Sequence, residues 1–144
     1  MTRLLFLATI FSISICGCQM KSNEDSNTNR QYDYSDVEEK KIEWNELFSI
    51  EKESYLVYIY SPTCGHCNEI KQSVIEFALQ SDDFYFVLFA KEINVGNHIE
   101  NSIGADNIDE VVILGTPTLL VIRNHVLTDN IAGSSTILTT LTNL

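Results

Sequence analysis

The sequence predicts a single α/β domain in which helices cover both faces of a mixed β-sheet. Apolar segments of strand length alternate along the chain with segments whose apolar residues recur every three or four positions. Hydrophobic residues make up 44% of the 144-residue chain, which is enough for one packed core and leaves little room for a second. The predicted order of strand, helix, strand, helix, hairpin and helix is typical of a mixed sheet.

The first half of this domain is predicted from its apolar pattern. Residues 42–50 carry apolar side chains at mixed helical spacing and predict a short helix. Residues 54–60 are nearly all apolar, β-branched or aromatic, which is typical of a central strand covered on both faces. Pro62 ends this strand. From Cys64 onward the apolar residues follow a helical period until residues 81–83 break it.

The second half continues the alternation. A strand is expected over residues 84–90, and the polar residues 97–109 predict a weakly helical connection. The remaining predicted elements are a strand over residues 118–122, a hairpin turn at residues 123–125, a strand over residues 126–131 ended by Gly133, and a helix over residues 134–144.

The first 41 residues differ in composition from this domain. Arg3 precedes a largely apolar run of 12 residues, 4–15. A helix of that length rises about 18 Å, well short of the roughly 30 Å hydrocarbon core, so the run fits a secretory signal over residues 1–17. Residues 18–41 are mostly polar and charged, which predicts a flexible tether to a folded domain over residues 42–144.

The end of the apolar run, Ile15-Cys16-Gly17-Cys18, resembles the lipobox of bacterial lipoproteins. The resemblance implies cleavage before Cys18 and a lipid on its thiol. The protein would then be anchored in the bacterial cell membrane and face away from the cytoplasm, because two or more acyl chains hold a protein stably. An ordinary cleaved signal, or an uncleaved signal anchor with a spare Cys18, is the alternative.

The motif with chemical meaning is Cys64-Gly65-His66-Cys67, at the junction of a strand and a helix. A thiol at a helix N-terminus meets free N–H groups and the positive end of the dipole, which lower its pKa. A protonated His66 would lower it further. Cys67 lies one helical turn away on the same face, and Gly65 admits close approach of another chain. This arrangement predicts thiol–disulfide exchange in which Cys64 attacks and Cys67 resolves.

Two segments, residues 55–67 and 115–121, together with Gly133, resemble the thioredoxin superfamily, and the CGHC motif is the one found in protein disulfide isomerases. The resemblance implies a thioredoxin fold. It also implies a cis peptide bond before Pro117 and a substrate groove lined by Thr116 and Pro117. The alternative is a trans proline that only begins an edge strand.

Three positions depart from the pattern of the superfamily. Tyr58 stands where a buried Asp or Glu often passes the proton of the resolving thiol, so that proton must use another group or water. Thr63 replaces an aromatic residue and makes the rim more polar. Gln72 replaces a proline that often kinks the helix, so a straighter helix is expected.

Two other readings of the cysteine pair follow from the residues alone. Cys64 and Cys67 could form a structural disulfide, or bind a metal together with His66 or His98. A structural zinc site needs four ligands, and there is no second CxxC. We therefore expect no metal and no cofactor. His98 and His125 have polar neighbours, and we expect both to be solvated turn residues.

The expected partners follow from the motif and the charge. With 9 basic and 20 acidic side chains the net charge is −11, which argues against nucleic acid as a partner. We expect a monomer that meets cysteine-containing exported proteins, a redox partner and, through its anchor, the membrane. Because His66 favours the thiolate and hence the reduced form, an oxidase or isomerase is favoured. A thioredoxin-like reductant and a redox-inactive or metal-binding accessory lipoprotein are the alternatives.

Overall fold

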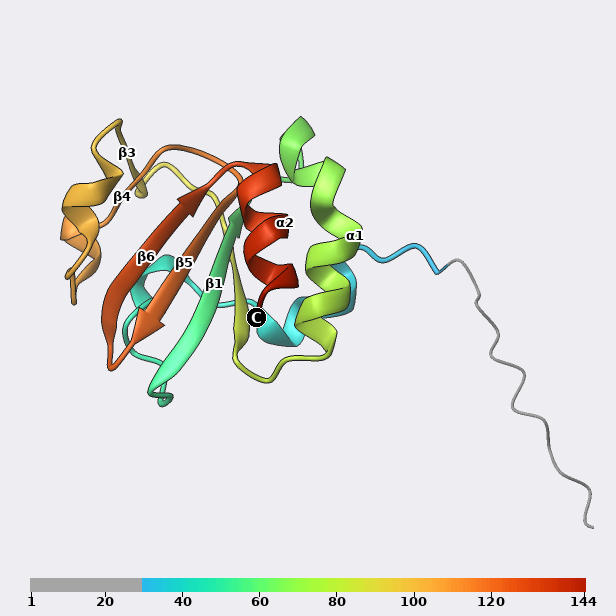
Figure 1. Cartoon of the computed structure of the whole chain (residues 1–144), viewed down its shortest axis with the longest axis horizontal. Coiled ribbons are helices and arrows are strands. Elements are labelled where there is room, and N and C mark those ends of the chain that lie inside the picture. The colour runs from blue at the N-terminus through green and yellow to red at the C-terminus, as the bar shows by residue number, and fades with distance from the viewer. Residues whose placement is uncertain (1–29) are drawn as a thin grey trace, which may run out of the picture.

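The computed structural model describes residues 30–144, which form a four-stranded sheet with helices packed against it (Figure 1). The strand order is β2-β1-β5-β6. Strand β1 pairs parallel with β2 and antiparallel with β5, and β5 pairs antiparallel with β6, so the sheet is mixed and the predicted fold class is confirmed. The main elements are β1 (Ser54–Tyr60), α1 (Gly65–Leu79), β2 (Phe84–Leu88), β5 (Thr118–Arg123), β6 (Val126–Ala132) and α2 (Ser134–Thr142).

Helices lie on both faces of the sheet, but unequally. Figure 1 shows α1 and α2 side by side on one face, where they pack against each other. The opposite face is covered by short 3-10 helices and loops from residues 42–50 and 93–113. None of the described helices is long and apolar enough to cross a membrane.

The connection between β2 and β5 contains a small second sheet that the sequence pattern does not reveal. Strands β3 (Asn94–Val95) and β4 (Val112–Ile113) pair in parallel, and the 3-10 helices η3 (Ile99–Ser102) and η4 (Ile108–Glu110) lie between them. The buried Ser102 hydroxyl accepts a hydrogen bond from the Val112 N–H at 2.8 Å. Strands of two residues are too short to show a period, which is why only a weakly helical connection is predicted.

The prediction of a tether reaching residue 41 is wrong for residues 32–41. Residues Tyr34–Lys40 form the 3-10 helix η1, whose Tyr34 and Val37 are buried against α1. The side-chain amide of Gln72 bonds both the N–H and the carbonyl of Tyr32, each at 2.7 Å. Buried apolar side chains at positions three apart provide the burial that a tether lacks. The predicted signal and Cys18 lie outside the described residues.

The predicted helix over residues 42–50 is reduced to the 3-10 helix η2 (Trp44–Glu46) followed by a turn. Trp44 and Leu47 are nevertheless buried on the face opposite the α-helices. The hairpin is confirmed, because Asn124 and His125 connect β5 to β6 with φ of 51° and 59°, as a two-residue turn of type I′ requires.

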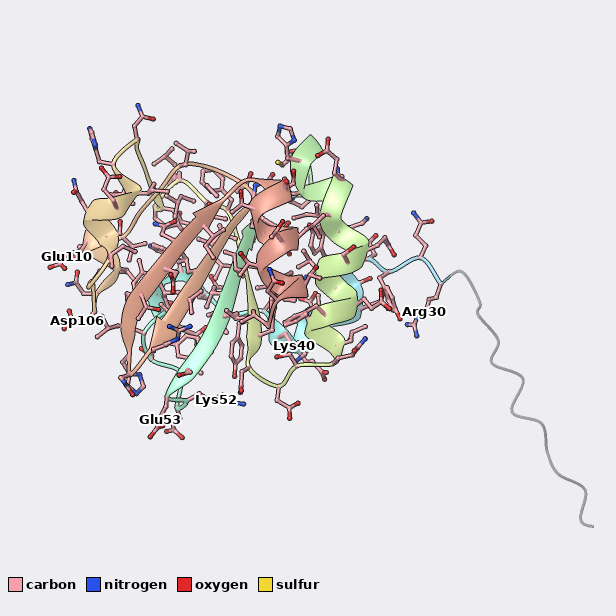
Figure 2. All side chains as sticks on the ribbon, viewed as in Figure 1. Arg30, Lys40, Lys52, Glu53, Asp106 and Glu110 are labelled. Carbon is pink, nitrogen blue, oxygen red and sulfur yellow. The ribbon has the colours of Figure 1, made fainter. Side chains whose placement is uncertain are left out.

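The charged side chains lie at the surface. Among the labelled residues of Figure 2, Lys52 and Glu53 project outward from the segment before β1, and Asp106 and Glu110 project outward from the connection before β4. The acidic excess of the chain is therefore carried by its surface, and the interior of the sheet layers is apolar.

Candidate active site

The first cysteine lies at the point where β1 gives way to α1. Cys64 is the N-cap of α1, with an extended backbone, and its Sγ accepts a hydrogen bond from the Cys67 N–H at 3.4 Å. The first turn of α1 contains no acidic residue, whose negative charge would weaken the positive potential of the helix N-terminus at Cys64. The end of the strand therefore places a partly exposed sulfur directly over the free N–H groups of the helix.

The loop before β5 approaches this sulfur from the other side. The Thr116–Pro117 bond is cis, as predicted, and it precedes a central strand, so the alternative of a trans proline on an edge strand is wrong. Thr118 pairs with Ile59 near the end of β1, which brings the loop to the cysteine. The Cys64 thiol donates to the Thr116 carbonyl at 3.2 Å.

The two thiols have contrasting environments. Burial alone would raise the pKa of Cys64, but hydrogen bonds from the Thr116 side chain, the Cys67 thiol and the backbone N–H groups of Cys67 and His66 outweigh it and lower that pKa. Cys67 is fully buried, and burial raises the pKa of its thiol above the ordinary value. Because the thiolate is the reactive form, Cys64 is the sulfur equipped to attack.

His66 is placed differently from the other residues of the motif. Its side chain is 71% exposed, and its Nδ1 lies 3.2 Å from Oε2 of Glu69, one turn along α1. The hydrogen bond to Glu69 raises the pKa of His66, and the nearby Cys64 adds a smaller rise. Glu69 also accepts a hydrogen bond from Ser134 at the start of α2. This partner of His66 was not identified from the sequence, although its spacing of three residues is a recognisable helical pair.

The surface around Cys64 is open and partly apolar. A Cβ added at Gly65 would meet no atom within 4 Å, so another chain can approach the motif there. Leu88, Phe89 and Leu114 are large exposed hydrophobic residues. All three lie at the end of the sheet that carries Cys64, since the Phe89 N–H bonds the Tyr60 carbonyl and Leu114 leads into the Thr116 loop.

The comparisons with known proteins agree with this geometry. A thioredoxin family model matches residues 35–143, which is most of the chain. The chain belongs to the thioredoxin family. A comparison with curated protein sequences finds no match.

Solved thioredoxin structures are similar to this chain at low identity. The reduced Schistosoma mansoni thioredoxin pre-protein is 15% identical, with 72% of this chain and 93% of that chain covered and a TM-score of 0.46. A Plasmodium falciparum thioredoxin is 18% identical over 72% and 97% of the two chains, with a TM-score of 0.46. The short form of thioredoxin f from spinach chloroplast is 14% identical over 72% and 92%, with a TM-score of 0.48.

This thioredoxin-family chain has a tyrosine pair behind its second cysteine. Tyr58 is fully buried in β1, and the buried Tyr34 reaches the same core from η1. Neither hydroxyl has a hydrogen-bond partner within residues 30–144. Tyr34 lies in the segment that its polar composition predicts to be a tether. The spacing of Asp33 and Asp36, which form a capping box around η1, is the signal that could have identified it.

The structure brings no metal site to the cysteines of this thioredoxin-family domain. Within residues 30–144 no group of three His, Cys, Asp or Glu side chains is close enough to hold a metal ion. His98 is exposed and lies beside Glu100 at the start of η3, and His125 is exposed in the hairpin turn. Both histidines are exposed as expected, but only His125 lies in a turn, because His98 caps η3.

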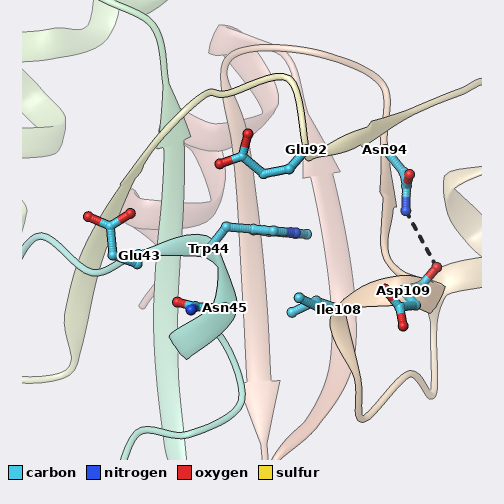
Figure 3. Close-up of a pocket in the computed structure, with 7 residues that line it drawn as sticks. All are labelled: Glu43, Trp44, Asn45, Glu92, Asn94, Ile108 and Asp109. Carbon is cyan, nitrogen blue, oxygen red and sulfur yellow. Dashed lines mark hydrogen bonds between the residues drawn. The ribbon is translucent and has the colours of Figure 1, made fainter.

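A pocket of about 510 Å³ lies on the face of the sheet opposite the α-helices (Figure 3). The indole of Trp44 lines the pocket, and Ile108 lies near it. The residues that line it are Glu43, Trp44, Asn45, Glu92, Asn94, Ile108 and Asp109. It contains no cysteine, so the chemistry of the CGHC motif is separate from it.

Proposed function

We propose that this protein is an extracytoplasmic, membrane-tethered thiol–disulfide oxidoreductase that exchanges disulfides with exported proteins. The observation that supports this most is the asymmetry of the dithiol. Cys64 is partly exposed with a lowered pKa, and Cys67 is buried one turn away with a raised pKa. One sulfur attacks or is attacked, and the other closes the internal disulfide.

The exchange is balanced in electrons. In the oxidising direction a substrate thiolate attacks Sγ of Cys64 in the Cys64–Cys67 disulfide, and Cys67 leaves as a thiolate. A second substrate thiolate then attacks the substrate sulfur of the mixed disulfide and releases Cys64. The substrate loses two electrons to form its disulfide, and the protein holds them as the dithiol. The lowered pKa of Cys64 makes it the better leaving group in that last step.

Two features support oxidation or isomerisation over reduction. The hydrogen bonds that lower the pKa of Cys64 stabilise the thiolate and therefore the reduced form, which makes the couple more oxidising. His66 adds positive charge when protonated, although Glu69 offsets part of it. A thioredoxin-like reductant on the same fold remains the alternative direction.

The surface favours a protein as substrate. The exposed Leu88, Phe89 and Leu114 lie at the end of the sheet that carries the motif, and they offer apolar surface that a small thiol would not need. Within residues 30–144 the Thr116 N–H donates to no backbone carbonyl, so it is available to an extended chain. We therefore assign substrate binding to Gly65, Thr116 and Pro117, as the superfamily resemblance implies.

The location rests on the N-terminal sequence. If Cys18 carries lipid, the full chain fractionates with membranes and Cys18→Ser releases it to the soluble fraction. If wild type and variant fractionate alike, the proposal that Cys18 carries lipid fails. The proposal of disulfide exchange then still stands.

The decisive experiment is equilibration of the Cys64–Cys67 pair with glutathione, using Cys64→Ser as the inactive control. We expect a potential well above that of thioredoxin, which is about −270 mV. A value near thioredoxin's would make the protein a reductant. A Cys64→Ser variant that still exchanges disulfides would overturn the enzyme proposal, and tight stoichiometric binding of copper or zinc would favour the accessory role.

A further inference from the structure

The face of the sheet that α1 and α2 cover, the helix face, holds two buried hydroxyls without a hydrogen-bond partner in the described part of the chain. Tyr58 is fully buried, Tyr34 is nearly so, and neither oxygen has a hydrogen-bond partner within residues 30–144. Leaving a buried polar group unpaired costs folding free energy, and native proteins retain few such groups. Replacing either ring by phenylalanine would avoid the cost, so the two hydroxyls call for an explanation.

Both hydroxyls are neighbours of the second cysteine. Tyr34, Tyr58 and Cys67 belong to one buried cluster between the sheet, η1 and α1. Burial is the main reason that the pKa of Tyr58 is far above its ordinary value, and Tyr34 and Cys67 add to the rise. Burial likewise raises the pKa of Tyr34, and negative charge on Cys67 adds to the rise. Tyr60 lies on the same face of β1; burial raises its pKa, and the nearby Lys41 lowers it.

A phenol that stays neutral cannot take the proton of Cys67, so Tyr58 does not replace the superfamily's acid as a base. It can donate a hydrogen bond. The exchange reaction creates an acceptor beside it, because Cys67 becomes a thiolate each time the internal disulfide opens. A donor fixed in advance beside developing negative charge is an effective way to stabilise it.

We propose that Tyr58 is a positioning residue of the exchange reaction, whose hydroxyl donates a hydrogen bond to the Cys67 sulfur whenever that sulfur is negatively charged, with the Tyr34 hydroxyl supporting it. The proposal rests on the proposed function, because the acceptor appears only during exchange. When a substrate thiolate bonds to Cys64, the Cys64–Cys67 bond breaks and its electron pair goes to Cys67. Tyr58 holds that thiolate until water protonates it. In the reverse direction Cys67 gives its proton to water, and Tyr58 increases the ionised fraction.

Few other titratable groups face Cys67. Cys64 lies beside it at the start of α1, and the titratable side chains that share its buried cluster are Tyr34 from η1 and Tyr58 and Tyr60 from β1. The helix α2, which packs against α1, carries no titratable side chain. Asp33 and Lys71 meet at the outer side of Tyr34, with Lys71 Nζ 5.8 Å from its ring centre. The pH dependence of Cys67 can therefore be affected by only a few neighbouring groups of the described residues.

The test follows the two halves of the reaction separately. The full chain carries Cys16→Ser and Cys18→Ser, so that only the pair reacts with limiting dithiobis-nitrobenzoate. The first coloured thiolate is released when Cys64 attacks, and the second when Cys67 closes the disulfide. The rate of the second release is measured against pH in wild type and in Tyr58→Phe, Tyr34→Phe and Tyr60→Phe, with thermal unfolding as the check on folding.

In Tyr58→Phe we expect the second release to slow about tenfold at neutral pH, with its midpoint about one pH unit higher, as the loss of a hydrogen bond to a charged group would cause. The first release stays unchanged, Tyr34→Phe shifts the midpoint less, and Tyr60→Phe behaves as wild type. An unchanged profile in Tyr58→Phe, or an equal shift in Tyr60→Phe, overturns the proposal and leaves the oxidoreductase function standing. If Tyr58→Phe does not fold, an unchanged profile in Tyr34→Phe overturns it. If wild type never closes the disulfide, the proposed function fails as well.

Discussion

The two faces of β1 carry tyrosines in opposite situations. On the face away from the α-helices, Tyr55 is buried and its hydroxyl donates to the Leu47 carbonyl at 2.6 Å. On the helix face, the hydroxyl of the equally buried Tyr58 has no partner among residues 30–144. On the first face the tyrosine hydroxyl is paired, and no cysteine belongs to the buried cluster. The second keeps unpaired donors beside Cys67, so stability and chemistry are carried by different sides of one strand.

The largest effect on stability should come from the face without cysteines. Leu120 is fully buried there in the central strand β5. We expect Leu120→Ala to lower the free energy of unfolding by about 2–5 kcal/mol through lost burial and a residual cavity. Urea unfolding measures it. The rate of Cys64 alkylation in the folded protein should not change, and a changed rate would show that the two faces are coupled.

Replacing the tyrosines on the two faces should change the free energy of unfolding by less than Leu120→Ala does, and it compares the two faces directly. Tyr55→Phe removes a hydrogen bond and leaves the Leu47 carbonyl without it, so the free energy of unfolding should fall by about 1 kcal/mol. Tyr58→Phe removes a hydroxyl that has no partner among the residues that the structure describes, and stability should stay the same or rise. Equal losses in parallel denaturation curves would contradict the distinction between the faces.

The pH dependence of alkylation should distinguish the partly exposed Cys64 from the buried Cys67. The lowered pKa of Cys64 predicts half-maximal alkylation below the pH of a free cysteine, about 8.5, and the raised pKa of Cys67 predicts a midpoint above it. The lowered pKa of Cys64 stabilises the reduced fold above its unfolded pKa, and this contribution disappears as pH falls through the folded pKa. Site-resolved mass spectrometry follows both alkylations, and a reversed order of midpoints would refute the assignment of roles.

The smallest effect concerns His66 at the surface. Its hydrogen bond to Glu69 raises its pKa, so the pair favours the folded state below the unfolded pKa of histidine and stops doing so as pH rises through the folded pKa. Glu69→Gln should return the pKa of His66 towards 6.5 in an NMR titration. Ser134→Ala, which removes only the other contact of Glu69, is the matched control and should leave that pKa unchanged.

Much of the fold could be predicted because its strong elements are local in sequence. The strand over residues 54–60, the helix after Cys64 and the hairpin at residues 123–125 follow from period and turn chemistry, and all three are present. The strands β3 and β4 are stabilised by pairing between distant segments and were missed. The helix η1 was assigned to the tether because its composition is polar, although Val37 is fully buried.

The sequence by itself indicated the chemistry of this protein. It places two cysteines three residues apart at a strand–helix junction, so that one lies at the N-terminus of the helix and the other lies one turn into it. It also located the cis Pro117, through the superfamily resemblance. Only the tertiary structure decided the surroundings of the two sulfurs. The Thr116 carbonyl, the pairing of Glu69 with His66, and the unpaired Tyr34 and Tyr58 arise where separate elements pack. Burial and hydrogen bonding set a pKa, and both depend on neighbours that lie far away along the chain.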